Sequence, residues 1–272
     1  MRAELGGGLA ATLRPGPGAK VLWLHGYAMD TRVWAPLWQR LPDLYHVGVD
    51  LPGHGRSARL PADLHAGAER LAEVASRFAI DHVVGLSYGG VVALEVLALA
   101  PDHFRSAVLG APSLPGTPHD AVMERIYQQL IAVRAGGAPP AELAARWQAA
   151  PVFVHLRDRG EAWDLVLAAI AEHPFAEATP DGMRAMAQGA PAGRFAAVTT
   201  PAAVVVGEHD LPATRRAGEA VAAQLAGGAV VHAAGCGHLA LLERPDAAAG
   251  LVAAVVGGAP PAITPWPSEP AG

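Results

Sequence analysis

Apolar and polar residues follow one another along the chain in blocks that predict strands and helices in turn. Compact apolar runs predict buried strands at 21–24, 45–49, 107–109, 202–206 and 229–232, with a further strand starting at Val83. Helices are predicted at 31–41, 64–78 and 91–100, and a hairpin at 1–19. Strands that alternate with helices indicate the α/β class, with a mostly parallel sheet covered on both faces.

The pattern changes between Gly116 and Phe195, where no convincing strand interrupts the helical segments. A connection of this length far exceeds the usual ~4–6 residues. We therefore predict an α/β core at 1–115 and 196–257 and a helical cap at 116–195, with helices at 120–135 and 161–170. The segment 258–272 carries five prolines and is predicted to be a disordered tail.

Composition narrows the possible partners. Hydrophobic residues make up 51% of the chain and charged residues 17%, which is typical of a globular protein. The formal net charge of −5 argues against nucleic acid or an anionic membrane as a partner. The N-terminus lacks a signal-peptide pattern and no apolar run is long enough to span a bilayer, so we expect a cytoplasmic protein. The oligomeric state cannot be predicted.

Metal and disulfide chemistry are not expected. Cys236 is the only cysteine, which excludes an intrachain disulfide and a thiolate metal cage. The twelve histidines form no pair with metal-binding spacing on a recognisable helix. We expect neither a metal nor another cofactor.

A nucleophilic serine is predicted at position 87. The sequence GLSYG at 85–89 matches G-x-S-x-G and lies between a predicted strand and a predicted helix. The glycines allow the sharp strand-to-helix turn of a nucleophile elbow, which exposes the serine hydroxyl above the sheet. Ser87 is therefore the predicted nucleophile.

Two loops after later strands supply a predicted acid and base. Asp210 follows the strand at 202–206 and His238 follows the strand at 229–232. Their chain order, Ser…Asp…His, is the one that accompanies a nucleophile elbow. His238 would take the Ser87 proton, and Asp210 would orient the imidazole. Glu208 is an alternative acid, whereas Cys236 is expected only to pack.

Backbone amides after the first long strand complete the predicted site. Gly26 allows the chain to bend, so that the N–H of Tyr27, together with that of Tyr88, can form an oxyanion hole. Each such donor contributes about 3 kcal/mol in the transition state. The alternative is that Gly26 belongs to an ordinary turn with His25 packed locally.

Five segments together resemble the α/β-hydrolase superfamily, most closely its small, helical-capped esterases, lactonases and carbon–carbon bond hydrolases. They are LHG at 24–26, DLPGHGRS at 50–57, GLSYGG at 85–90, VGEHD at 206–210 and GH at 237–238. The resemblance implies the α/β-hydrolase fold and the Ser87–His238–Asp210 triad. Ser87 argues against dehalogenases and epoxide hydrolases, which carry aspartate at that position, and His54 is expected to be structural.

The predicted activity is carboxylesterase-like hydrolysis of a small ester, lactone or thioester through an acyl-serine, without cofactor. Lyase or synthase chemistry with the same triad, carbon–carbon bond hydrolysis and a ligand-binding role remain alternatives, because fold does not determine function. We expect the cap to shape the substrate pocket. The candidate pocket walls are Trp147, Phe153, Trp163, Met183 and Met186. The candidate partners for a substrate carboxylate are Arg125, Arg146, Arg157 and Arg184.

Overall fold

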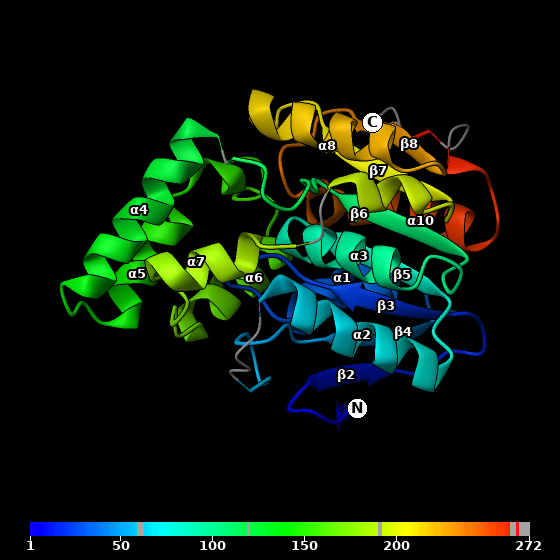
Figure 1. Ribbon diagram of the computed structural model, residues 1–272, viewed down its shortest axis with the longest axis horizontal. Helices are drawn as coiled ribbons and strands as arrows, with labels where there is room; N and C mark the ends of the chain where they lie inside the picture. The colour runs from blue at the N-terminus through cyan, green and yellow to red at the C-terminus, as the bar shows by residue number, and fades with distance from the viewer. Residues whose placement is uncertain (59–62, 119, 190–191, 262–264, 267–272) are drawn as a thin grey trace.

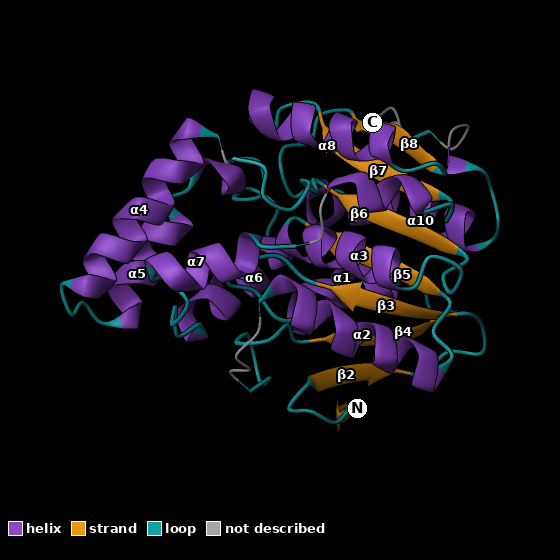
Figure 2. Cartoon of the chain, in the orientation of Figure 1, coloured by secondary structure: helices purple, strands orange, loops and turns teal. Residues whose placement is uncertain are grey.

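A central eight-stranded sheet organises the chain (Figures 1 and 2). The computed structural model describes residues 1–58, 63–118, 120–189, 192–261 and 265–266. The strands are β1 (Arg2–Glu4), β2 (Ala10–Arg14), β3 (Lys20–Leu24), β4 (Tyr45–Val49), β5 (His82–Leu86), β6 (Ser106–Gly110), β7 (Ala202–Gly207) and β8 (Gly228–Ala233). Their order is β1-β2-β4-β3-β5-β6-β7-β8, and the β1–β2 and β2–β4 pairs are antiparallel while the other pairs are parallel. The predicted α/β fold class is confirmed.

Two apolar cores lie on opposite faces of this sheet. Successive β3 side chains alternate between them, since Trp23 packs in one cluster and Leu22 and Leu24 pack in the other. Helices α2 (Leu64–Phe78), α3 (Tyr88–Leu99) and α8 (Pro212–Gln224) cover the Leu22 face. The Trp23 face is covered by η1 (Thr31–Trp34), α1 (Ala35–Gln39), α9 (Ala240–Glu243) and α10 (Pro245–Val256).

Helix α3 is buried on nearly every side, as its apolar sequence predicts. Its single charge, Glu95, is fully buried and lies 2.7 Å from Nδ1 of His65 on α2. A buried carboxylate needs such a partner because desolvation without one is costly. The pair therefore joins α2 to α3 on this face of the sheet.

A helical insertion separates β6 from β7. It contains α4 (Ala121–Ala135), α5 (Pro140–Gln148), η2 (Pro151–Phe153), α6 (Glu161–Glu172), α7 (Pro180–Ala187) and η3 (Ala192–Ala197), and no strand among its described residues. Figure 1 shows α4 to α7 grouped beyond one end of the sheet. We call α4 to α7 with their connecting loops the cap. Its division from the core at 116 and 195 stays a prediction.

The ends and the surface add three observations. Within the predicted disordered tail, 262–264 and 267–272 lie outside the described residues, whereas Trp266 is buried against the Trp23 core. The disorder of the tail stays a prediction.

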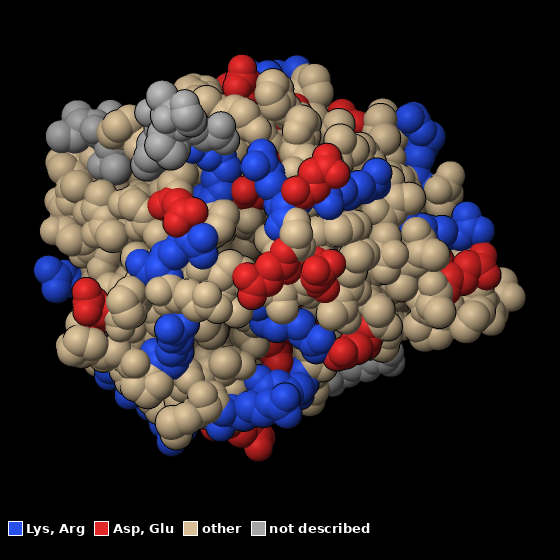
Figure 3. Space-filling view, turned by 180° about the vertical axis from the view of Figure 1, so that it is seen from behind, with Lys and Arg blue, Asp and Glu red and all other residues tan. Residues whose placement is uncertain are grey.

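No helix in the described ranges is long and apolar enough to cross a membrane. On the face seen in Figure 3, basic and acidic side chains are interspersed.

A close backbone contact determines where α3 starts. A Cβ atom on Gly89 would lie 2.1 Å from the carbonyl oxygen of Leu24 and 2.5 Å from that of His25. Only a residue without a side chain permits α3 to begin against the end of β3. This contact carries the turn between β5 and α3, and with it Ser87.

Gly89→Ala should destabilise the protein by about 3 kcal/mol, because the contacted carbonyl groups cannot move aside as a side chain can. Urea unfolding followed by circular dichroism measures the loss. Gly193→Ala is the control, since a Cβ at Gly193 meets no atom within 4 Å. Its stability should stay within about 0.5 kcal/mol of the wild type, and equal stabilities of the two variants would contradict the packing argument.

Candidate active site

Ser87 occupies a strained turn between β5 and α3. Its φ of 53° lies in the left-handed region that residues with a side chain rarely adopt. Such a conformation costs about 1–3 kcal/mol and persists only where the surrounding structure holds it. The Ser87 N–H donates to the carbonyl of Gly110 on β6 at 2.7 Å, which anchors the turn.

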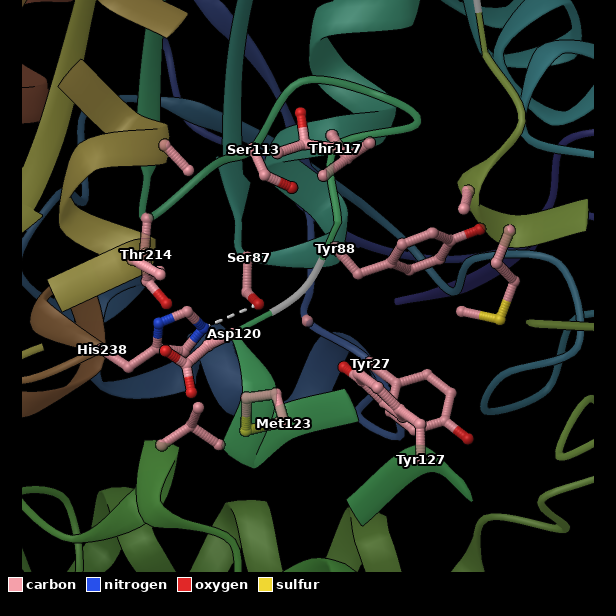
Figure 4. Close-up of a pocket in the computed structure, with 18 of the residues that line it drawn as sticks. Tyr27, Ser87, Tyr88, Ser113, Thr117, Asp120, Met123, Tyr127, Thr214 and His238 are labelled. Atoms are coloured by element: carbon pink, nitrogen blue, oxygen red, sulfur yellow. Dashed lines mark hydrogen bonds between the residues drawn. The ribbon is translucent and has the colours of Figure 1, made fainter. Parts of the chain in front are cut away.

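A continuous chain of hydrogen bonds joins Ser87 to two other predicted site residues. Nε2 of His238 lies 2.9 Å from the Ser87 Oγ, and Figure 4 shows the imidazole facing the hydroxyl. Nδ1 of His238 lies 2.8 Å from Oδ2 of Asp210. The loops after β5, β7 and β8 bring the three together because the carboxyl ends of parallel strands meet at one edge of a sheet.

Burial and charge set the proton affinity of His238. Burial alone would lower the pKa of this imidazole, but the Asp210 carboxylate and its hydrogen bond outweigh that effect and raise the pKa above 6.5. Asp210 is itself buried and accepts a second hydrogen bond, from the Leu211 N–H at 2.7 Å. This geometry can supply a nucleophile, an adjacent base and a fixed imidazole tautomer.

The structure also shows where the alternative candidates for the acid and their neighbours lie. Glu208 is exposed and accepts a hydrogen bond from the Gly235 N–H at 2.8 Å, so Asp210 is the carboxylate that contacts His238. The neighbouring His209 ring stacks on His155, and Cys236 is fully buried. Within the described residues, no group of three or more potential ligands could hold a metal ion.

Glu243 is a residue of the site that sequence reasoning missed. This buried carboxylate accepts hydrogen bonds from the N–H groups of Gly237 at 2.6 Å and Leu239 at 3.0 Å. It therefore holds the amides on both sides of His238. Burial raises the pKa of Glu243 even though the two amides oppose the shift. An isolated acid within the apolar sequence LALLE, five residues after His238, was the available signal.

The two amides predicted to form an oxyanion hole belong to residues that line the same pocket as Ser87. Among the described residues, neither the Tyr27 nor the Tyr88 N–H donates to a backbone or side-chain acceptor. His25 is fully buried and ties this loop down, since its Nε2 accepts from the Leu51 N–H at 2.9 Å. The local packing of His25 thus coexists with free amides, and their catalytic role stays a prediction.

The pocket above Ser87 is lined by the cap together with the loops after β3, β5 and β6 and the start of α8 (Figure 4). Its apolar wall includes Met123, Tyr127, Trp147, Phe153, Met183 and Met186. Its polar lining includes Ser113, Thr117, Asp120 and Thr214. The expectation that Trp163 lines the pocket is wrong, because its ring packs behind Phe153 at 5.6 Å between centroids. None of the described residues of α6 lines the pocket, and the sequence alone does not reveal this.

No lysine or arginine is among the described residues that line this pocket. The four arginines considered for a substrate carboxylate lie elsewhere. Arg146 pairs with Glu142, Arg184 pairs with Asp181, and Arg157 donates to backbone carbonyls. These side chains have partners on the cap surface, and the described lining of the pocket holds no arginine or lysine.

The mostly parallel sheet, the strained serine turn and the serine–histidine–aspartate chain define the α/β-hydrolase class. The model of the Alpha/beta hydrolase family matches residues 21–251, and the chain belongs to this family. A pimeloyl-[acyl-carrier protein] methyl ester esterase from Chromobacterium violaceum is 32% identical over 167 residues, which cover 53% of this chain and 65% of the relative. A 2-succinyl-6-hydroxy-2,4-cyclohexadiene-1-carboxylate synthase from Escherichia coli is 29% identical over 146 residues, which cover 51% of this chain and 56% of the relative.

Similarity at the level of the fold extends over nearly the whole chain. A thermophilic esterase from Thermogutta terrifontis superimposes with a TM-score of 0.73 at 22% identity and covers 93% of this chain and 94% of that one. At this identity the likeness shows the fold alone. The curated relatives above are matched over less than two thirds of their own length.

Glu243→Gln should lower the free energy of unfolding by about 1–3 kcal/mol, because the side-chain NH₂ cannot accept the amide proton that one carboxylate oxygen now takes. Chemical unfolding monitored by fluorescence measures the change. Glu208→Gln is a matched control, since Glu208 also accepts a loop N–H but is exposed to water. If both substitutions cost the same, burial of Glu243 does not matter.

Proposed function

We propose that the chain is a serine hydrolase that cleaves small, uncharged carboxylic esters, lactones or thioesters through an acyl-serine intermediate. The observation that carries the proposal is the unbroken hydrogen-bond chain from Ser87 through His238 to Asp210, at the base of a largely apolar pocket. No metal or other cofactor is needed for this chemistry.

In the first half-reaction, the Ser87 Oγ bonds to the substrate carbonyl carbon while its proton passes to Nε2 of His238. Asp210 accepts the Nδ1–H bond and stabilises the imidazolium. The carbonyl oxygen becomes an oxyanion that the Tyr27 and Tyr88 amides bind. Collapse breaks the bond to the leaving oxygen or sulfur, which takes the proton from His238. Water then attacks the acyl-serine with the same proton transfers and releases the acid.

The charge of the pocket lining favours an uncharged substrate. A carboxylate in this largely apolar pocket would lose hydration without gaining a lysine or arginine partner among the described residues, and Asp120 in the lining adds a like charge. The Chromobacterium relative is named for the hydrolysis of a methyl ester, which agrees with ester cleavage. The synthase relative is named for a product that carries carboxylate groups, and the lining gives that chemistry less support.

Ser87→Ala should reduce kcat on a responsive ester by about 10⁴-fold with no loss of folded structure. The assay is a panel of short and long neutral esters, lactones and thioesters, with an ω-carboxylate ester matched to one neutral ester. The neutral member of that pair should have the higher kcat/KM. Labelling of the wild type by a fluorophosphonate should disappear in the variant. Labelled serine without any hydrolysis product would instead favour the lyase or binding alternatives.

Asp210→Asn should reduce kcat/KM by about 10⁴-fold because the amide favours the wrong imidazole tautomer, whereas Glu208→Gln should have little effect. In the wild type, kcat/KM should rise with pH as His238 loses its proton. Since Asp210 holds the pKa of His238 above 6.5, the midpoint of that rise should lie above pH 6.5. A larger loss in the Glu208 variant, or a midpoint below pH 6.5, would contradict these assignments.

A further inference from the structure

One mostly buried carboxylate of the cap contacts the loop that carries a proposed oxyanion donor. The Tyr27 hydroxyl donates to Oε1 of Glu177 at 2.6 Å. Nε2 of His173 donates to the same oxygen at 2.9 Å. Both donors belong to residues that are at least 95% buried, and the Glu177 side chain is only 17% exposed. Glu177 lies between α6 and α7, 150 residues after Tyr27.

The protonation states make this a strong contact. Burial favours the neutral form of Glu177, but the hydrogen bond and electrostatic attraction of His173, the attraction of His54 and, least, the hydrogen bond from Tyr27 lower the pKa of this carboxyl to about 2. Burial raises the pKa of Tyr27 well above its ordinary value, so the phenol keeps its proton. A phenol that donates to an ionised, buried carboxylate forms a short, charge-assisted hydrogen bond.

The Tyr27 ring is enclosed by side chains of the cap. Tyr127, Trp147 and Phe175 lie at centroid distances of 6.1, 5.0 and 6.3 Å, all nearly edge-on. Figure 4 shows the Tyr27 and Tyr127 rings adjacent, on the cap side of Ser87. These ring contacts restrict the position of the Tyr27 side chain, and the hydrogen bond to Glu177 holds its hydroxyl group within the cap.

Backbone strain is present on both sides of this contact. Ala28, next to Tyr27, has a φ of 56°, and Phe175, two residues before Glu177, has a φ of 50°. A bulky residue in the left-handed region is an outlier that persists only when its surroundings determine it. The Tyr27 loop and the cap loop are therefore each held away from their relaxed conformations where they meet.

We propose that Glu177 is a positioning residue that holds the Tyr27 side chain in the cap and so keeps the Tyr27 N–H aimed at the substrate oxyanion. The amide and the phenol belong to one residue, so a shift of the ring that rotation about its side-chain bonds does not absorb moves the Tyr27 backbone. Oxyanion donors act only when they point at the developing charge. The cap thus contributes to the chemical step through Glu177 as well as to the walls of the pocket. This inference rests on the proposed function.

The test is a double-mutant cycle on the second-order rate of fluorophosphonate labelling, which requires a reactive serine and an oxyanion hole but no knowledge of the substrate. Tyr27→Phe keeps the ring and the amide, and Glu177→Met keeps the length of the side chain but removes the acceptor, which the amide oxygen of a glutamine would retain. Removal of one oxyanion donor costs about 10²–10³-fold, so misalignment of one should slow labelling about tenfold in each variant. The double variant should also be about tenfold slower, because both changes break one interaction.

Glu172→Met is the matched control. Glu172 also joins the cap to the core, through Nη1 of Arg32 at 3.0 Å, but it is exposed and does not contact Tyr27. Its labelling rate should equal that of the wild type. Circular dichroism establishes that each variant is folded. KM for a responsive ester should change less than kcat in the Tyr27 and Glu177 variants, since the amide acts mainly in the transition state.

The outcomes separate this inference from the proposed function. Wild-type labelling that Ser87→Ala abolishes, with single variants as fast as the wild type, overturns the role of Glu177 and leaves the hydrolase proposal standing. Fold losses that multiply in the double variant, or an equal loss in Glu172→Met, also overturn it. If the wild type is not labelled at all, the nucleophile assignment fails and the inference fails with it.

Discussion

The contact between the start of α3 and the end of β3 is the constraint on which the rest of the site depends. Gly89 lets the helix backbone approach the carbonyls of Leu24 and His25, and the strained Ser87 lies two residues before it, in the same turn. The same contact aligns the N-terminus of α3 with the Tyr27 loop. The nucleophile and both candidate oxyanion amides therefore derive their relative positions from one backbone packing interaction.

Local patterns in the sequence were sufficient to predict the sheet and the chain of polar residues on it. The strands from Val21 onward are short apolar runs, and Ser87, Asp210 and His238 each follow such a run, so their meeting at one edge of the sheet could be anticipated. The G-x-S-x-G turn is similarly local, because its glycines are required by close backbone packing within a segment of five residues. The choice between Asp210 and Glu208 needed the structure, since both lie in one turn after β7.

Contacts between distant segments could not be predicted in the same way. Glu177 and Tyr27 are separated by 150 residues and share no motif, and nothing in either local sequence marks them as partners. Trp163 shows the related limit within a helix, because the aromatic character of a residue does not tell which neighbour it packs against. Glu243 lies between these cases, since an acid among apolar residues signals a buried partner without naming it.

The bond between Tyr27 and Glu177 has a consequence for how the two parts of the molecule can be exchanged. If the cap were replaced by that of another family member, the remaining core would still present the buried Tyr27 phenol where the two parts meet. Without an acceptor at the equivalent of Glu177, that phenol would be left unpaired at a cost of about 1–3 kcal/mol. The cap and the Tyr27 loop should therefore be exchanged together, so that a chimera keeps both Tyr27 and Glu177.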